Sequence, residues 1–289
     1  MDIAVLGMGR MGRALAVRLL EGGHEVTVWN RSKGRAGEVV SAGAREADTV
    51  AGAAEGVDVV LTMLANDDAV RSVALGEIRP SIGEAATYVD SSTVSPALSG
   101  ELATAFPRFV ALPVLGSPAA VRAGQAMYLA GGSAEVVGSL EPVLSSLSQS
   151  VRRYETTQLA LTAKVATNLL LLSGVVALAE SFTVGRSGGL SDDQLRDLLA
   201  NSLMVAPGLK NRFEGVLTGS MDAWWTTALG GKDAGLAVEI AREAGVELPA
   251  AEVVRDLYDK AAASGLDNDD IVAVTDLYRS PARAGSEGS

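Results

Sequence analysis

The chain has 289 residues, of which 48% are hydrophobic, and it carries a formal net charge of −11 at pH 7. An acidic surface repels phosphate backbones and anionic lipid head groups, so the charge argues against nucleic acid or a membrane as a partner. The chain has no cysteine and a single histidine, His24, which excludes disulfides, thiolate catalysis and cysteine-bound metals and leaves no basis for a histidine metal site or catalytic triad.

The first half of the chain alternates short apolar runs with segments of helical or turn character. We expect strands at Asp2–Leu6, Glu25–Trp29, Asp58–Leu64, Thr87–Asp90, Arg108–Leu112 and Met127–Ala130, and a helix at Arg13–Glu21. Strands that alternate with helices indicate a parallel sheet with helices on both faces.

From about residue 157 the strand signals disappear and helical spacing takes over. We expect helices at Leu159–Gly185, Ser191–Asn201, Ala234–Ala244, Pro249–Ser264 and Asn268–Tyr278. The sequence therefore predicts an α/β domain with a doubly wound parallel sheet over residues 1–157 and an all-α domain over residues 158–289, joined by the long helix.

Two further features bear on where the protein works. The amino terminus lacks the basic start, apolar stretch and cleavage site of a signal peptide. The longest mostly apolar run, Leu169–Ala179, is shorter than the ~20 residues that cross a bilayer. We therefore expect a soluble cytoplasmic protein, with a small, polar and frayed tail from Ser280.

The first strand is followed directly by Gly7-Met8-Gly9-Arg10-Met11-Gly12, which fits the pattern G-x-G-x-x-G and opens the first helix. In this context Gly7 permits a tight turn, Gly9 lets the backbone approach a pyrophosphate and Gly12 lets the helix pack on the strand. The free amides at the start of the helix would then face the phosphates. We predict a dinucleotide site at this loop, and the alternative is an ordinary glycine turn.

The end of the second strand indicates which dinucleotide is bound. Proteins that bind NAD usually have Asp or Glu there, which holds the ribose 2′-hydroxyl. This chain has Asn30-Arg31-Ser32 instead. Arginine can pair with a 2′-phosphate, and serine and asparagine can donate to it, so we predict a preference for NADP, with NAD also possible. The alternative is that Arg31 is a solvated charge.

Three more segments follow expected strands and so reach the edge of the sheet at which ligands bind. They are Met63-Leu64-Ala65, the stretch Asp90–Pro96 with Thr93 at its centre, and Leu115-Gly116-Ser117. Each has a purely structural alternative. Ser92 and Thr93 could cap a helix before Pro96, and Gly116 and Pro118 could form a turn.

Lys164 stands near the start of an apolar helix, and Asn168 follows it one turn later on the same face. A buried ammonium needs a partner or loses its proton, and burial lowers the pKa of a lysine toward the range useful for acid–base catalysis. Lys164 is therefore the best available proton donor, and Asn168 could orient it or a substrate oxygen. The alternative is a lysine whose ammonium reaches solvent from an interface helix.

Taken in chain order, these segments resemble the β-hydroxyacid dehydrogenases, the family of 3-hydroxyisobutyrate dehydrogenase, tartronate semialdehyde reductase and the glyoxylate/succinic semialdehyde reductases. The resemblance covers residues 2 to about 275. It rests on GMGRMG, DSSTVSP, LPVLGSPAAVRAGQAMYLAGG, KVATN, Ala179-Glu180, Gly231-Lys232-Asp233 and GLDNDDIVAV. It implies a Rossmann domain followed by a helical domain, and a homodimer or homotetramer.

The resemblance also implies a role for each matching residue. Lys164 would be the catalytic acid/base and Asn168 would assist it. Lys232 would reach over the cofactor, and Asp233 would anchor that segment. The residues expected to line the cofactor are Met63, Leu64, Ala65 and Thr93, besides the glycine loop and Asn30-Arg31-Ser32. The residues expected to contact substrate are Thr93, Leu115, Gly116, Ser117, Lys164, Asn168 and Trp225.

Three departures from the family pattern concern the substrate pocket. Leu115-Gly116-Ser117 stands where the family has S-G-G for a substrate carboxylate, so the expected hydroxyl is lost unless Ser117 replaces it. Gln158-Leu159-Ala160 replaces a glycine-rich turn. Trp224 and Trp225 stand where phenylalanine is frequent, although they could equally be core residues. Together these changes favour a larger or less polar substrate.

The sequence thus predicts reversible hydride transfer between NADPH and a small carbonyl or hydroxy compound, such as a semialdehyde or ketoacid, with no metal. Two alternatives remain. An imine reductase would share the two-domain plan but generally lacks the lysine. A non-catalytic cofactor-binding module would be expected to lose it.

Overall fold

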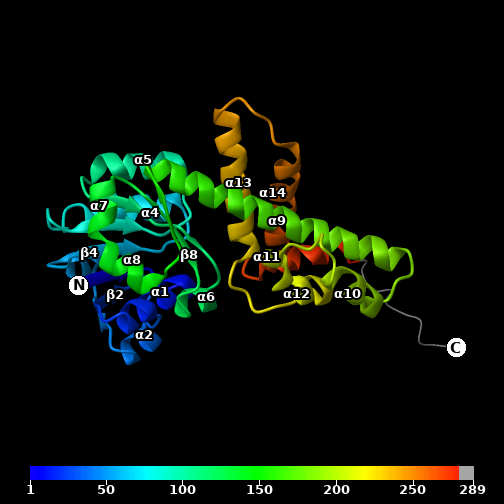
Figure 1. The fold of residues 1–289 in the computed structure, drawn as a ribbon, viewed down its shortest axis with the longest axis horizontal. Helices are drawn as coiled ribbons and strands as arrows, with labels where there is room; N and C mark the ends of the chain where they lie inside the picture. Colours follow the sequence, from blue (N-terminus) through cyan, green and yellow to red (C-terminus); the bar gives the residue numbers. More distant parts are fainter. Residues whose placement is uncertain (280–289) are drawn as a thin grey trace. The chain divides into compact units, whose positions relative to one another are not determined.

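The structure is a computed structural model that describes residues 1–279, so the tail from Ser280 lies outside the described residues. Its internal contacts divide the chain into two compact units, Met1–Lys164 and a second that begins at Val165. The first unit is an α/β domain and the second is helical (Figure 1). The predicted fold class is confirmed.

One nine-stranded sheet forms the centre of the first unit. Its strands are β1 (Asp2–Leu6), β2 (Glu25–Trp29), β3 (Arg45–Glu46), β4 (Val59–Thr62), β5 (Thr87–Asp90), β6 (Phe109–Ala111), β7 (Val114–Leu115), β8 (Met127–Gly131) and β9 (Val151–Tyr154). They lie in the order β3-β2-β1-β4-β5-β6-β8-β7, with β9 beside β8. The pairs from β3 to β6 are parallel, as expected for a doubly wound sheet.

The sheet departs from the expected parallel arrangement at one end. β8 runs antiparallel to both β6 and β7, and β9 then returns parallel to β8. The connection from Leu115 to Met127, which are register partners, is too short for the crossover that parallel strands require. β3 and β7 were not expected because two residues carry no period, and β9 was not expected because its sequence VRRY is polar.

Helices cover both faces of this sheet. They are α1 (Arg10–Glu21), α2 (Gly37–Ser41), α3 (Val50–Ala54), α4 (Asp67–Val73) with the π-helical turn η1 (Ala74–Ile78), α5 (Pro96–Ala105), α6 (Pro118–Arg122), α7 (Ala134–Ser139) and α8 (Glu141–Leu147). The first of them begins three residues before the expected Arg13, because helical conformation starts directly after Gly9.

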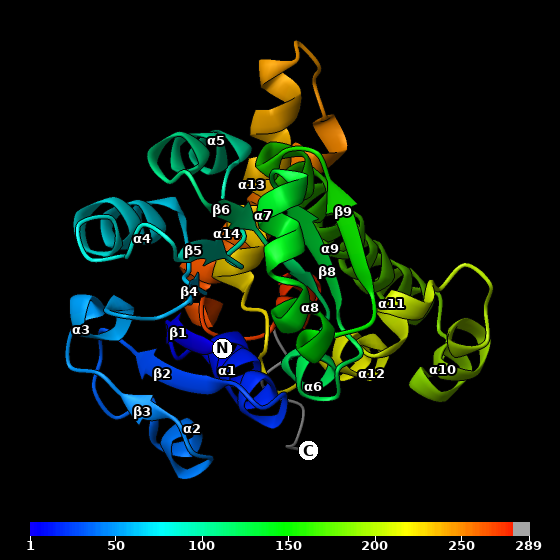
Figure 2. The ribbon, with the colours of Figure 1, turned by 60° about the vertical axis from the view of Figure 1, so that its left-hand side comes forward.

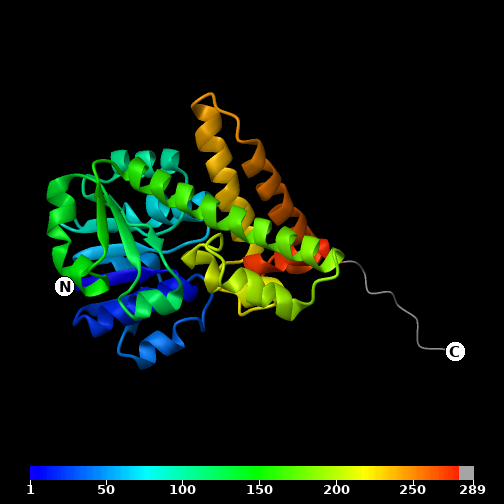
Figure 3. The same cartoon turned by 45° about the vertical axis from the view of Figure 1, so that its right-hand side comes forward.

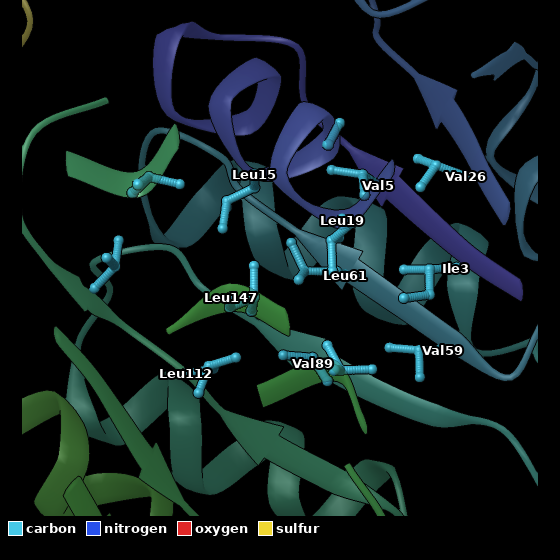
Figure 4. Close-up of a cluster of buried hydrophobic side chains, with 14 of the residues drawn as sticks. Ile3, Val5, Leu15, Leu19, Val26, Val59, Leu61, Val89, Leu112 and Leu147 are labelled. Carbon is cyan, nitrogen blue, oxygen red and sulfur yellow. The ribbon is translucent and has the colours of Figure 1, made fainter. Parts of the chain in front are cut away.

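The pleat of the strands sends alternate side chains to two separate cores. Ile3 and Val5 of β1 point toward α1 and α8, where Leu15, Leu19 and Leu147 pack against them (Figure 4). The residues between them on β1 pack against α3, α4 and α5 on the other face, which Figure 2 shows opposite α1. Each large apolar side chain buried in this way contributes about 1.5–3 kcal/mol, which explains why β1 is apolar from Ile3 to Leu6.

The second unit is built from helices alone in the described residues. They are the continuation of α9 (Thr157–Ser187), α10 (Asp192–Ala200), α11 (Pro207–Lys210), α12 (Phe213–Thr218), α13 (Thr227–Glu243), α14 (Pro249–Ala261), the π-helical turn η2 (Ala262–Leu266) and the 3₁₀ helix η3 (Ile271–Tyr278). α13 and α14 lie side by side (Figure 3). The short helices α11 and α12 were not expected, and the last expected helix is of the 3₁₀ type.

α9 is long and apolar enough, by length and composition, to cross a membrane, with a hydropathy of 1.7 over its best window. This corrects the expectation based on Leu169–Ala179 alone, because the helical stretch continues on both sides of that run. Core helices of soluble proteins meet the same criterion. Among the buried positions of α9, Ala160 and Leu161 pack in a core of the first unit, and Leu172 and Phe182 pack in a core of the second.

His24, which precedes β2, predicts a pH dependence of stability. Its Nε2 lies 3.1 Å from Ser146 Oγ, and burial lowers the pKa of the imidazole below its ordinary value. The unfolded chain therefore binds the proton more readily, so the stabilisation from neutral His24 is present above pH about 6.5 and is lost as the pH falls. Urea unfolding at pH 7.5 and 5.5 should show a larger loss of stability in the wild type than in His24→Gln. Equal losses would contradict this prediction.

Candidate functional site

The glycine loop between β1 and α1 has the geometry of a phosphate-binding turn. Gly7 adopts φ +105°, and a Cβ there would lie 2.3 Å from Met63 O. A Cβ on Gly12 would lie 1.8 Å from Gly7 O, so both glycines are required by the fold itself. Gly9 differs, because an added Cβ would meet no protein atom within 4 Å. The protein does not need a glycine at this position, whereas the close approach of a pyrophosphate does.

The loop is tied to the end of β2 by Asn30. Its Oδ1 accepts from Met8 N at 2.9 Å, and its Nδ2 donates to Ser32 O at 2.8 Å. Asn30 therefore shapes the glycine loop and the turn after β2, a role that the sequence did not indicate. The side chains of Arg10, Arg31 and Ser32 are exposed, so a cofactor phosphate could reach them.

The ends of β4 and β5 are joined by a chain of buried hydrogen bonds that converges on Asp90. Thr62 Oγ1 and Ser92 Oγ each donate to Asp90 Oδ1 at 2.7 Å, and Tyr88 OH lies 3.0 Å from Thr62 Oγ1. Ser92 Oγ in turn accepts from Leu64 N at 2.8 Å. Burial raises the pKa of Asp90, whereas its hydrogen bonds from Ser92 and Thr62 lower it.

A second carboxylate joins the same two loops further out. Asp67 accepts from Ser95 N at 2.9 Å and from Ser95 Oγ at 2.5 Å, and Ser95 caps α5 by accepting from Leu98 N. The structural alternative for Ser92 and Thr93, a cap on this helix, does not hold, because Ser95 is the N-cap. These contacts place Leu64 and Thr93 on two loops that are fixed to one another at the carboxyl edge of the sheet.

The segment Leu115-Gly116-Ser117 ends β7 and starts α6. Gly116 has φ +148°, and Ser117 is the N-cap of α6, where its Oγ accepts from Ala120 N at 3.2 Å. The segment therefore turns at Gly116 and leads into α6, which Ser117 caps. Ser117 Oγ is committed to the helix as an acceptor, and residue 115, which is half-buried, presents an apolar side chain.

Lys164 lies on α9, and its Nζ donates to Val114 O at 2.7 Å. Lys164 is half-buried, whereas the sequence predicted a buried lysine, and its ammonium has a carbonyl partner on β7. The contact places Lys164 beside the residue that precedes Leu115-Gly116-Ser117.

The start of α9 packs directly against β8. A Cβ on Gly131 would lie 2.5 Å from Thr156 O and 2.7 Å from Ala160 Cβ, so only glycine permits this close approach. Close packing of α9 on the sheet is thus permitted by a glycine of the strand, Gly131, while the segment before the lysine is Gln158-Leu159-Ala160. This packing fixes the part of α9 from which Lys164 projects.

In the second unit, Asp233 joins two of the predicted residues. Asn168 Nδ2 donates to Asp233 Oδ2 at 2.8 Å, and Lys232 Nζ lies 2.9 Å from Asp233 Oδ1. Asn168 is 5% exposed and Asp233 is 3% exposed. The carboxylate therefore orients the amide of Asn168 so that its oxygen stays available as an acceptor. The sequence placed Asp233 beside Lys232 but did not indicate its bond to Asn168, because the two lie on different helices.

Trp224 and Trp225 directly precede α13 and are both half-buried. Trp225 also packs against the apolar core of the second unit, as the structural alternative proposed. Among residues 1–279, no group of His, Asp and Glu side chains is suited to hold a metal ion.

A doubly wound sheet with this glycine loop defines a dinucleotide-binding protein, and comparisons with known proteins narrow the class. Residues 2–157 match the NAD-binding domain of 6-phosphogluconate dehydrogenase, and residues 160–278 match the NAD-binding region of NADP-dependent 3-hydroxyisobutyrate dehydrogenase. The chain belongs to the β-hydroxyacid dehydrogenase family and is an NAD(P)-dependent oxidoreductase.

Similar proteins match along almost their whole length. An uncharacterised oxidoreductase of Bacillus subtilis, YfjR, is 34% identical over 95% of this chain and 98% of its own. Glyoxylate/succinic semialdehyde reductase 1 of Arabidopsis thaliana is 30% identical over 96% and 99%. The structure of Mycobacterium tuberculosis 3-hydroxyisobutyrate dehydrogenase with L-serine has the same fold, with a TM-score of 0.83, 24% identity and coverage of 96% and 99%.

The different surroundings of the loop glycines generate a prediction. Gly12→Ala should destabilise the fold by roughly 1–3 kcal/mol because its methyl overlaps the backbone of Gly7. Gly9→Ala should leave stability within about 0.5 kcal/mol of the wild type but weaken NADPH binding about tenfold or more, because the methyl fills the space of the pyrophosphate. Urea unfolding and NADPH fluorescence titration measure the two effects. Wild-type NADPH affinity in Gly9→Ala would contradict the assignment.

Proposed function

We propose that the chain is an NADPH-dependent reductase that transfers hydride reversibly to a carbonyl compound, with Lys164 as the proton donor. The observation that carries the proposal is the hydrogen bond from Lys164 Nζ to Val114 O, 2.7 Å long. It holds an ammonium at a defined place beside the loop that leads into Leu115-Gly116-Ser117.

The choice of Lys164 rests on where the other candidates lie. His24 precedes β2, so it stands at the amino edge of the sheet, whereas ligands of such sheets bind beyond the carboxyl edge. Burial raises the pKa of Tyr88 well above its ordinary value, and its hydroxyl lies 3.0 Å from Thr62 Oγ1 inside the sheet. Lys164 is half-buried and belongs to the family motif.

The bound nicotinamide would supply the hydride, and the protein would supply position and a proton. The turn at Gly9 and the first amides of α1 fit the pyrophosphate, as the free space at Gly9 supports. In reduction, Lys164 as an ammonium donates to the oxygen of the substrate, and in oxidation the neutral amine takes the proton back. Asn168, with its amide oriented by Asp233, accepts a hydrogen bond from the hydroxyl of the alcohol.

The preference for NADP is proposed from the turn after β2. No carboxylate stands there, and Arg31 and Ser32 are exposed. Asn30 is engaged with Met8 and Ser32, so the guanidinium of Arg31 is the main group for a 2′-phosphate.

The substrate is proposed to be a carbonyl compound with an apolar part, such as a semialdehyde or ketoacid larger than the small hydroxyacids. Leu115 removes the hydroxyl that would bind a carboxylate, and Ser117 Oγ is held at the N-cap of α6. The absence of that hydroxyl also favours an imine as a second candidate substrate. A panel of semialdehydes, ketoacids and cyclic imines, assayed by NADPH consumption, separates the two. By family resemblance we extend the proposal to a cytoplasmic homodimer or homotetramer.

Lys164→Met should lower kcat by about 10²–10⁴, because it removes the proton donor but not the groups that hold the cofactor. The dissociation constant for NADPH should stay close to that of the wild type. Lys260→Met, which removes an exposed lysine of α14, is the matched control. Stopped-flow turnover and NADPH titration provide the measurements. A Lys164→Met enzyme with the turnover of Lys260→Met would refute the role.

Arg31→Glu should raise the KM for NADPH by roughly tenfold or more, because a charged hydrogen bond worth about 1.5–3 kcal/mol is lost. The KM for NADH should fall or stay unchanged. Arg45→Glu makes the same change of charge at an exposed site on β3 and should affect neither cofactor. An equal rise in the KM for NADPH in both variants would show a general electrostatic effect rather than a specific site for the 2′-phosphate.

A further inference from the structure

The helical unit contains an ion pair that is completely withdrawn from water. The guanidinium of Arg212, which precedes α12, pairs through Nη1 with Asp270 Oδ1, and both side chains are 0% exposed. Burial lowers the pKa of Arg212, and the neighbouring Asp270 raises it. Within the described residues, Nε and Nη2 of Arg212 have no hydrogen-bond partner.

Asp270 distributes its hydrogen bonds over two segments. Its Oδ1 also accepts from Val272 N and so caps η3, whereas its Oδ2 accepts from Trp224 N at 3.2 Å and Trp225 N at 3.4 Å. The backbone adds a bond from Ile271 N to Trp225 O at 2.9 Å. The main chain of the two tryptophans is thus hydrogen-bonded to the start of η3.

Arg212 holds the same two residues through their rings. Its guanidinium carbon lies 4.0 Å from the centroid of the Trp224 ring and 6.0 Å from that of Trp225. A guanidinium stacked on an indole at this distance gains a cation–π attraction, which is strengthened when water is excluded. One face of Trp224 is therefore covered, and its orientation is fixed.

Stability alone is a poor explanation for this arrangement. A buried ion pair seldom stabilises a fold more than apolar residues of the same volume would, because both charges lose their hydration. This one also leaves two nitrogens of Arg212 without hydrogen bonds. What the pair does provide is a single conformation for the segment that enters α13, the helix of Lys232 and Asp233.

We propose that Arg212 and Asp270 are positioning residues that hold Trp224 and Trp225 as a rigid aromatic wall, which selects carbonyl substrates with a bulky apolar or aromatic substituent. Both rings are half-buried and so keep an open part for such a group. The proposed selectivity rests on the proposed carbonyl reduction. The restraint of Trp224 and Trp225 by Arg212 and Asp270, here called the clamp, does not depend on that reaction.

The test uses Arg212→Met, which removes the charge and the planar group, and Arg212→Lys, which keeps only the charge. Arg196→Met, which removes an exposed arginine paired with Glu214, is the control. The ratio of kcat/KM for 3-phenylpropanal to that for glyoxylate reports selectivity. Acrylamide quenching reports the clamp, measured in a Trp29→Phe background in which residues 224 and 225 are the only tryptophans.

We expect Arg212→Met to lower the selectivity ratio about tenfold, mainly through the KM for 3-phenylpropanal, and to double the quenching constant, with a smaller effect in Arg212→Lys. Arg196→Met should match the wild type. A wild-type selectivity ratio and a wild-type quenching constant in Arg212→Met overturn the proposal. If Arg212→Met fails to fold, wild-type values of both quantities in Arg212→Lys overturn it. If the wild type reduces no carbonyl, the proposed function and the selectivity fail together, while altered quenching still establishes the clamp.

Discussion

A carboxylate that is 1% exposed, Asp90, is the constraint on which the cofactor edge of the sheet depends. Withdrawing a carboxylate from water is costly unless its oxygens accept hydrogen bonds. The groups that satisfy Asp90, Thr62 and Ser92, come from the ends of two neighbouring strands, and Ser92 also receives the amide of Leu64. The cost of burial is offset only while both loops keep their positions, so one buried group holds the backbone on which a nicotinamide would rest.

The same logic applies to the polar residues of α9. Lys164 and Asn168 are one turn apart on a predominantly apolar helix, and each donates a hydrogen bond to a defined acceptor, Val114 O and Asp233 Oδ2 respectively. Such a bond restrains the rotamer of the side chain that makes it. A restrained position suits groups that are proposed to exchange protons or hydrogen bonds with a substrate.

The sequence predicted the elements and motifs that are specified by residues close together in the chain. β1, β2 and β5 were placed at their observed bounds because apolar runs end at Gly7, Asn30 and Ser91, and the glycine loop was found by its spacing. Contacts between distant residues carry no such signature. The bond of Asn30 to Met8, the convergence on Asp90, the seat of α9 on Gly131 and the Arg212–Asp270 pair all join segments whose proximity only the fold creates. The antiparallel end of the sheet was missed for the same reason, since β7 is two residues long.

The most direct test of the central claim, that Lys164 supplies the proton, is chemical rescue of Lys164→Ala by a series of primary amines of different pKa. We expect small amines to restore NADPH-dependent reduction, and we expect the logarithm of the restored rate to vary linearly with the pKa of the amine, because the added ammonium then donates the proton. A variant that no amine rescues, or whose rescue is independent of amine pKa, would contradict it.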